Sequence, residues 1–77
     1  MQLEVLLLNP EEVIFEGKAR NIILPGEQGI FEILPFHKRL LSRLVSGTLV
    51  IDDRNFSIKR GVVKVNQNSV AIIIEDK

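Results

Sequence analysis

The 77-residue sequence contains no cysteine, tryptophan or tyrosine, and it has a single histidine, His37. Without cysteine, no disulfide can stabilise the fold and no thiolate can bind a metal. A chain of this length buries only about 60% of the surface that its unfolded form exposes, which is enough for one thin core. The sequence therefore predicts a single domain, residues 1–77, that depends on its apolar core or on a partner.

An excess of charge is also missing, because ten basic and ten acidic residues cancel. Nucleic-acid binding needs a basic surface that meets phosphates, and a membrane-surface module needs a cluster of basic residues. The first eight residues lack the positive region and the long apolar run of a secretory signal, and no apolar run approaches the length of a membrane span. Charge and hydropathy thus argue against a nucleic-acid or membrane-binding protein.

The apolar residues come in short runs rich in valine and isoleucine, each ended by turn residues. Such runs are typical of β-strands, and we expect hairpin turns at residues 53–55 and 66–68. The predicted fold is all-β: a flattened antiparallel β-sandwich or barrel of about 8–10 short strands. The predicted strands are residues 2–8, 12–16, 19–24, 30–34, 47–51, 56–59, 62–66 and 70–75.

Two stretches depart from simple alternation. Residues 70–74 are apolar at every position, which is typical of a strand that is central in its sheet or covered on both faces. In residues 37–47, "HKRLLSRLVSG", four apolar residues follow a helical spacing, so the sequence predicts a helical turn or a folded loop there.

Catalytic chemistry finds little support in the sequence. His37 has no partner in a recognisable motif, so we interpret it as a structural or interface residue. Glu27 and Glu32 are close to it in sequence, but these residues alone are a weak metal-binding signal. The stretch Gly26–Gly29 lacks the lysine and hydroxyl residue of a phosphate-binding loop and favours a tight exposed loop. The sequence therefore predicts no catalytic residue, no cofactor and no metal site.

An interaction surface is better supported. Residues 31–45 contain more large apolar side chains than a thin core accommodates, and surplus apolar surface beside charge marks a binding site more often than an active site. The alternative is that these side chains fill the core. Lys38, Arg39 and Arg43 form a basic cluster, which is either a solvated face or the rim of a contact with an acidic partner.

The order of short motifs along the whole chain is also informative. The motifs are the turn at residues 9–11, Phe15-Glu16-Gly17, the isoleucine-rich run 21–24, the loop 26–29, Ile33 to His37 with Leu40-Leu41, Ser46-Gly47, and the closing runs 61–65 and 70–74. This set, at matching spacing, resembles the N-terminal β-sandwich domain of the epsilon subunit of F-type ATP synthases. The chain departs from the family pattern at Glu32, Phe36, Lys38-Arg39 and Arg60.

The resemblance implies a mechanical role without catalysis. An epsilon-type subunit lies in the central stalk and couples the gamma subunit to the c-ring during ATP synthesis driven by protons or sodium ions. The gamma-facing residues implied are Asn9, Phe36, His37, Leu40 and Leu41. The loop implied to face the c-ring consists of Pro25, Gly26, Glu27, Gln28, Gly29 and Ile30.

The family commonly continues into a C-terminal helical hairpin that can inhibit hydrolysis and in some members binds ATP. The sequence stops at Lys77, so the resemblance implies a non-inhibitory chain that does not bind ATP. The implied location is peripheral, at the cytoplasmic face of the inner (plasma) membrane. Two alternatives stay open: a free-standing β-sandwich adapter, and a small hydrolase or metal-binding domain that uses His37 and Glu32.

Overall fold

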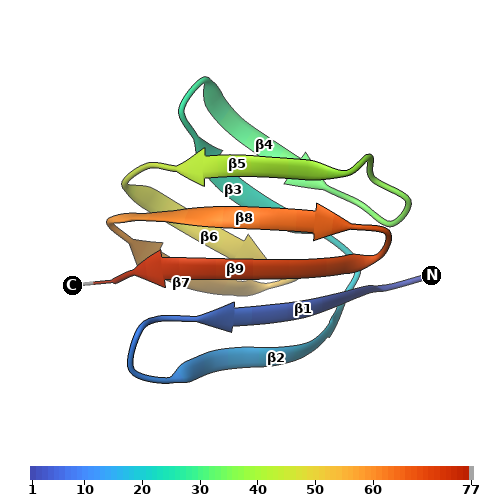
Figure 1. Cartoon of the computed structure of the whole chain (residues 1–77), viewed down its shortest axis with the longest axis horizontal. Coiled ribbons are helices and arrows are strands. Elements are labelled where there is room, and N and C mark those ends of the chain that lie inside the picture. The colour runs from blue at the N-terminus through green and yellow to red at the C-terminus, as the bar shows by residue number, and fades with distance from the viewer. Residues whose placement is uncertain (77) are drawn as a thin grey trace.

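The computed structural model describes residues 1–76, and nine β-strands make up most of them (Figure 1). The strands are β1 (Leu3–Leu8), β2 (Val13–Ala19), β3 (Ile22–Gly26), β4 (Gly29–Ile33), β5 (Leu40–Leu44), β6 (Gly47–Ile51), β7 (Arg54–Ile58), β8 (Arg60–Asn66) and β9 (Ser69–Glu75). Every predicted strand is present, so the all-β prediction is confirmed. Residues 1–76 contain no helix with the length and hydropathy needed to cross a membrane.

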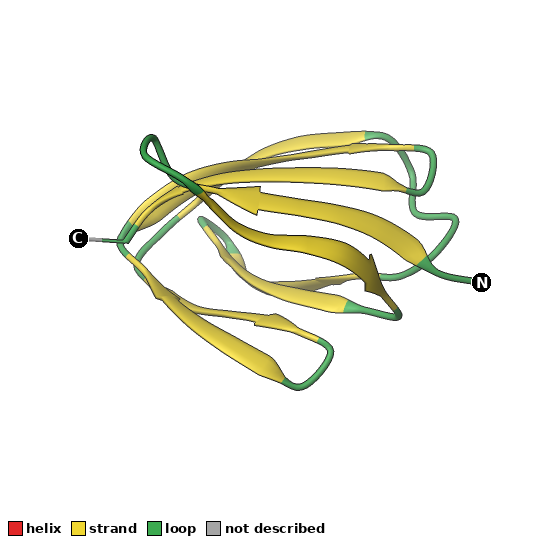
Figure 2. Ribbon diagram, turned by 90° about the horizontal axis from the view of Figure 1, so that it is seen from below, coloured by secondary structure: helices red, strands yellow, loops and turns green. Residues whose placement is uncertain are grey.

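The strands form one sheet that folds back on itself into two layers. The hydrogen-bonded order is β2-β1-β9-β8-β5-β3-β6-β7, with β4 beside β3. One layer contains β2, β1, β9, β8 and β5, and the other contains β4, β3, β6 and β7. The two layers are joined where β5 meets β3, at the single pair Gly26–Leu44. Figure 2 shows the two layers lying face to face. The pairing is antiparallel as predicted except between β1 and β9, which run parallel.

The core lies between the two layers, because alternate residues of each strand point inward. In β8, Val63 and Val65 are fully buried, whereas Lys64 and Asn66 on the opposite face are exposed. Sixteen buried apolar residues form the core: Leu3, Val5, Leu7, Ala19, Ile22, Leu24, Ile33, Leu44, Leu49, Ile51, Ile58, Val63, Val65, Val70, Ile72 and Ile74. The Arg54 guanidinium lies 5.5 Å from the centre of the Phe15 ring, so it joins β7 to β2 across the layers.

The prediction of a helical turn or folded loop in residues 37–47 is wrong, because Leu40–Leu44 form strand β5. Leu40 and Leu44 are four residues apart, and this spacing places them on one face of a strand as well as of a helix. Full antiparallel pairing with β8, from Leu40–Val65 to Leu44–Gly61, satisfies the backbone of β5 in the sheet. Leu41, which a helix would have turned toward the same face, points outward instead.

The two predicted hairpins exist, although one turn is shifted. Residues 52 and 53 connect β6 to β7, and Arg54 already belongs to β7, so the predicted turn at 53–55 was placed too late. Residues 67 and 68 connect β8 to β9, as expected. The first residue of each turn, Asp52 or Gln67, has a positive φ, which suits a two-residue connection between twisted strands.

Candidate interaction surfaces

Two of the predicted gamma-facing residues, Phe36 and His37, lie in the turn between β4 and β5. The backbone N–H of Phe36 donates to Oδ1 of Asn68 at 2.8 Å, and that of His37 donates to the Leu34 carbonyl at 3.1 Å. The side chain of Phe36 is 70% exposed. His37 is half-buried, and its Nδ1 lies 2.7 Å from the carbonyl oxygen of Lys38. The turn therefore presents an aromatic ring to solvent, while the histidine bonds within its own loop.

The structure does not bring all five predicted gamma-facing residues together. Leu40 pairs with Val65, Val65 with Val70, and Val70 with Val5, so the start of β5 lies level with the middle of β1. Asn9 follows the last residue of β1, at the end of the sheet where β5 finishes. Figure 1 shows the β1–β2 turn and the β4–β5 connection at opposite ends of the molecule.

Asn9 is itself part of the fold. Its side chain is 7% exposed, and its Oδ1 accepts hydrogen bonds from the backbone N–H groups of Glu11 and Glu12, both at 2.8 Å. Its Nδ2 lies 3.4 Å from both carboxylate oxygens of Asp76. These bonds hold the β1–β2 turn and connect it to the end of β9. A contact of Asn9 with gamma stays a prediction.

The loop predicted to face the c-ring is a β-hairpin whose tip is shorter than expected. Pro25 pairs with Ile30 and Gly26 with Gly29, so Glu27 and Gln28 alone form the turn. Pro25 and Gly26 are buried, whereas the four residues from 27 to 30 are exposed, with Ile30 at 79%. A Cβ on Gly26 would lie 2.7 Å from the Phe31 ring, which explains why this position is glycine. The polar and apolar contacts that the tip can offer are therefore Glu27, Gln28 and Ile30.

A shallow hollow of about 450 Å³ joins the two predicted surfaces. It is bordered by the hairpin residues Gly26–Phe31 on one side and by His37, Leu40 and Ser42 on the other. Sequence reasoning treated the hairpin and the histidine turn as separate contacts. The fold places them side by side, because β3 carries the hairpin next to β5.

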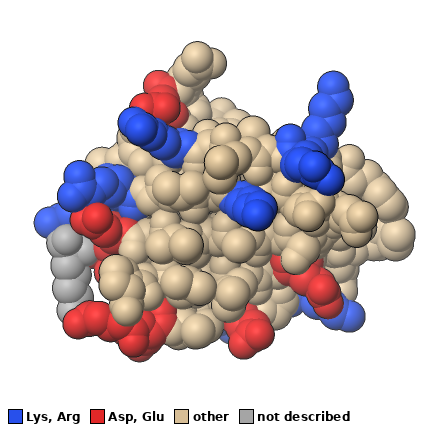
Figure 3. Space-filling model, viewed as in Figure 1, with Lys and Arg blue, Asp and Glu red and all other residues tan. Residues whose placement is uncertain are grey.

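The outer face of the five-stranded layer is an apolar surface that the sequence revealed only in part. Leu41, Ile73 and Val62 are 73%, 52% and 42% exposed. Val62 pairs with Ile73, whereas Leu41 pairs with Lys64, so this face also contains a lysine. Figure 3 shows that much of this face is uncharged, with one basic group near its centre and further charged groups around it. We define the outer apolar face as Leu6, Leu8, Leu41, Val62, Ala71 and Ile73. Apolar residues on both faces of β9 were the available signal. Of the two predicted alternatives, a central strand or one covered on both faces, the structure shows a central strand whose second face is partly exposed.

A second hollow, of about 390 Å³, lies at one end of the outer apolar face. Val62, Ile73 and Ile74 supply much of its apolar lining, and Arg43, Arg60 and Glu75 supply charge. Pro10 from the β1–β2 turn and Glu27 from the hairpin border it from two sides. The outer apolar face therefore connects the turn at Asn9, the hairpin tip and, through Leu41, the start of β5.

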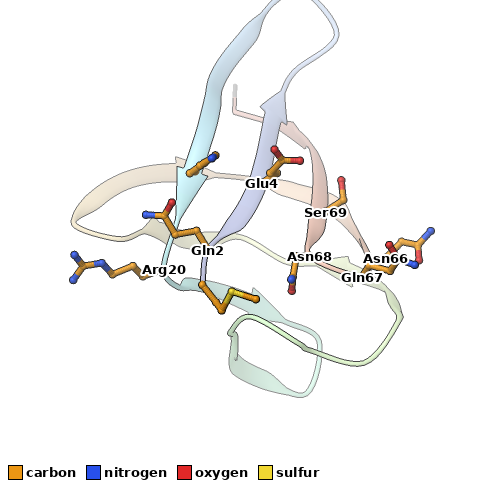
Figure 4. A pocket seen from close by; sticks show the side chains of 9 residues that line it. Gln2, Glu4, Arg20, Asn66, Gln67, Asn68 and Ser69 are labelled. Carbon is orange, nitrogen blue, oxygen red and sulfur yellow. The ribbon is translucent and has the colours of Figure 1, made fainter.

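A polar hollow of about 790 Å³ lies near the N-terminus. Lys18 and Arg20 border it, together with residues 66–69 of the β8–β9 turn. Figure 4 shows Arg20 and Asn66 on opposite sides of the hollow, with their polar groups directed away from each other. Arg20 is therefore directed away from the polar side chains of the β8–β9 turn.

His37 and Glu32, the pair considered for hydrolytic or metal chemistry, have separate partners. Oε2 of Glu32 accepts a hydrogen bond from Nδ2 of Asn21 at 2.8 Å, whereas His37 contacts the Lys38 carbonyl. Residues 1–76 contain no cluster of three or more carboxylate or imidazole side chains suited to a metal ion. The fold therefore gives this pair no common site.

Comparison with known proteins identifies the domain. Residues 2–76 match the family model of the ATP synthase delta/epsilon chain β-sandwich domain. The ATP synthase epsilon chain of Leptospira borgpetersenii serovar Hardjo-bovis is 32% identical over 78 residues, covering 96% of this chain and 61% of the relative. That of Bordetella avium is 37% identical over 76 residues, covering 92% and 54%. The chain thus spans a little over half the length of these relatives.

Two solved structures show the same fold. A chain in the Euglena gracilis mitochondrial ATP synthase (OSCP/F1/c-ring, rotational state 1) superposes with a TM-score of 0.88 at 21% identity, covering 95% of this chain and 50% of that one. A chain in the Tetrahymena thermophila mitochondrial ATP synthase (central stalk and c-ring) superposes with a TM-score of 0.85 at 20% identity, covering 99% and 65%.

These findings confirm the resemblance seen in the sequence and the β-sandwich prediction. They also confirm that the domain is not itself an enzyme, because the family is that of a non-catalytic chain of the synthase. The chain belongs to the ATP synthase delta/epsilon family, and residues 2–76 are its β-sandwich domain.

Proposed function

We propose that the chain works as a rotor subunit that couples the gamma subunit to the c-ring during ATP synthesis driven by protons or sodium ions. Support comes from the family match over residues 2–76 and from the fold shared with chains of mitochondrial ATP synthases. In this role the domain turns with the central stalk. It is held peripherally at the cytoplasmic face of the inner (plasma) membrane through its partners.

The outer apolar face is the observation that carries the proposed contact with gamma. Leu41, Val62 and Ile73 are large side chains exposed on one face of the sheet, where Val62 pairs with Ile73 and Leu41 pairs with Lys64. Exposed apolar surface of this kind, with charged groups within and around it, is typical of a protein interface. Leu41 and the half-buried Leu40 start the strand that follows Phe36 and His37, so the proposed gamma contact continues from the turn onto this face.

The hairpin tip is the proposed contact with the c-ring. Its exposed residues Glu27, Gln28 and Ile30 lie next to the proposed gamma surface, because Glu27 also borders the hollow beside Val62 and Ile73. One small domain can then touch two partners on adjoining surfaces. A charged group at the rim of an interface, such as Glu27, affects the rate of association and its salt dependence more than the final affinity.

Binding measurements test the proposal. The 77-residue chain should bind purified gamma subunit from the same organism in calorimetric titration, and it should join a gamma–c-ring assembly in a pull-down. Glu27→Lys should weaken ring association at low salt, whereas Asp53→Lys, an equal charge change in the exposed β6–β7 turn, should leave it unchanged. If the parent chain binds neither partner, the alternative of a free-standing adapter replaces the proposal.

Nucleotide binding is not part of the proposed function. The sequence has no phosphate-binding loop, and Arg20 is directed away from Asn66 across the polar hollow. We expect no heat of binding when the 77-residue chain is titrated with millimolar ATP. We also expect unchanged hydrolysis when this chain is added to the catalytic head. A saturable isotherm or reduced hydrolysis would contradict the proposal.

A further inference from the structure

Phe36 has a backbone conformation that is unfavourable for a bulky residue. Its φ is 67°, and only two other non-glycine residues within 1–76, Asp52 and Gln67, also have a positive φ. In this left-handed region the Cβ of an L-residue crowds the following carbonyl oxygen, and glycine avoids the clash. Asp52 and Gln67 lie in two-residue hairpin turns that call for this geometry. Phe36 instead lies in a longer connection, between Ile33 and Leu40.

The surrounding structure imposes this conformation. The Phe36 N–H donates to Oδ1 of Asn68, and the His37 N–H donates to the Leu34 carbonyl, so both amides around the strained residue are fixed. Asn68 belongs to the β8–β9 turn, which is anchored in the sheet by Glu4, whose N–H donates to the Asn68 carbonyl at 2.7 Å. Strain of this kind persists only where neighbouring groups hold it, and it is found most often at functional sites.

The fold gains little from the phenylalanine ring in return. The chain has four phenylalanines, and Phe15, Phe31 and Phe56 pack against the core. Phe36 is the fourth; it is absent from that packing and is 70% exposed. A glycine at this position would therefore relieve the backbone without removing a packed side chain.

We infer that Phe36 is a hydrophobic anchor that inserts into an apolar socket of the partner protein. The inference rests on the proposed function, in which that partner is gamma. Leu34, which is 50% exposed, extends the apolar contact. Lys38 and Arg39 are exposed and form no ion pair among residues 1–76, so the matching socket carries acidic groups at its rim. Asn68 is a positioning residue, because it fixes the backbone from which the ring projects.

Two substitutions of the anchor separate strain from binding. Phe36→Gly removes both the strain and the ring, and we expect its midpoint of thermal unfolding to equal or exceed that of the parent chain. Phe36→Ala keeps the strain, so its midpoint should be no higher than that of Phe36→Gly. Both variants should weaken gamma binding by about tenfold or more, as removal of a buried aromatic anchor does.

Gln67→Gly is the matched control, because Gln67 has nearly the same φ, 57°, in the turn that contains Asn68. It should relieve backbone strain without changing the affinity for gamma. The anchor is overturned if Phe36→Gly lowers the unfolding midpoint by several degrees, because the ring would then support the fold. It is also overturned if the parent binds gamma and Phe36→Gly binds it equally well. Failure of the parent itself to bind gamma would overturn the proposed function and the anchor with it.

Discussion

The β3–β4 hairpin and the turn between β4 and β5 each contain a residue with a positive φ, but the two residues differ completely. In the hairpin the residue is Gly29, with φ at 123°, and no side chain is required there. In the second turn the residue is Phe36, with φ at 67°, and its large ring is exposed. In the hairpin, residue type agrees with the backbone. In the second turn it conflicts with it.

This difference indicates in which of the two segments folding stability alone accounts for the type of residue. Local agreement between residue and conformation is expected wherever stability alone decides a position, and conflict is expected at functional sites. The hairpin is thus a stable support for Glu27 and Gln28. At the Phe36 turn, the proposed binding role accounts for a residue that folding does not explain. The predictions below test this comparison, from the largest expected effect to the smallest.

Placing a side chain on the hairpin glycine should have the largest effect. A Cβ on Gly29 would meet no atom within 4 Å, so the cost of Gly29→Ala comes from the backbone alone. A residue other than glycine at this φ costs about 1–3 kcal/mol of folding stability. Denaturant unfolding measures the loss. Gln67→Ala, a change at a position already occupied by a non-glycine residue, should cost much less; equal losses would show that the hairpin has no special need for glycine.

Removing the Asn9 side chain should have the next largest effect. Asn9→Ala leaves the N–H groups of Glu11 and Glu12 without their acceptor, and two such hydrogen bonds contribute about 2 kcal/mol. Stability should therefore fall more than gamma affinity does. Asn55→Ala, in the exposed part of β7, serves as the control with little change in either. A tenfold loss of affinity at unchanged stability would instead identify Asn9 as a direct contact of gamma.

Removing the acceptor that fixes Phe36 should have a smaller effect. Asn68→Ala deprives the Phe36 N–H of its partner at 2.8 Å, for a loss of about 1 kcal/mol, and the Phe36 amide should exchange faster with solvent. Asn68→Asp keeps an oxygen at the same position and should preserve slow exchange. Hydrogen exchange followed by NMR distinguishes the two variants. Equal exchange rates in both would show that the turn is held by other contacts.

The smallest effect is expected at His37. Its Nδ1 already faces the Lys38 carbonyl at 2.7 Å, so the ring has one nitrogen free for a partner. A single hydrogen bond contributes about 1 kcal/mol, so His37→Ala should weaken gamma binding by roughly fivefold. Titration calorimetry of this variant beside Phe36→Ala measures the ranking. A loss at His37 larger than that at Phe36 would reverse the roles assigned to the two neighbours.

Much of the fold could be predicted from the sequence because the core strands alternate. In β8, Val63 and Val65 alternate with polar residues, and a period of two has one structural meaning over such a short run. The helical prediction for β5 failed because Leu40 and Leu44 satisfy both periods. Pairing with β8 decided between them, and that pairing joins residues about 20 positions apart in the chain. A local sequence pattern contains no information about pairing between residues so far apart in the chain.

For the candidate site, too, one part could be predicted from the sequence and another part only from the tertiary structure. The ordered motifs identified the family, and the surplus of apolar residues in 31–45 predicted an interaction surface. Only the tertiary structure paired Val62 with Ile73 on the face that also contains Leu41, set the hairpin tip next to His37, and placed Asn9 at the far end from Phe36. Sequence alone determined which residues alternate and where turns interrupt them, because these are local properties of the backbone. The surface was decided by strand order, and the strain at Phe36 by the hydrogen bond that its N–H donates to Oδ1 of Asn68, 32 residues away in the chain.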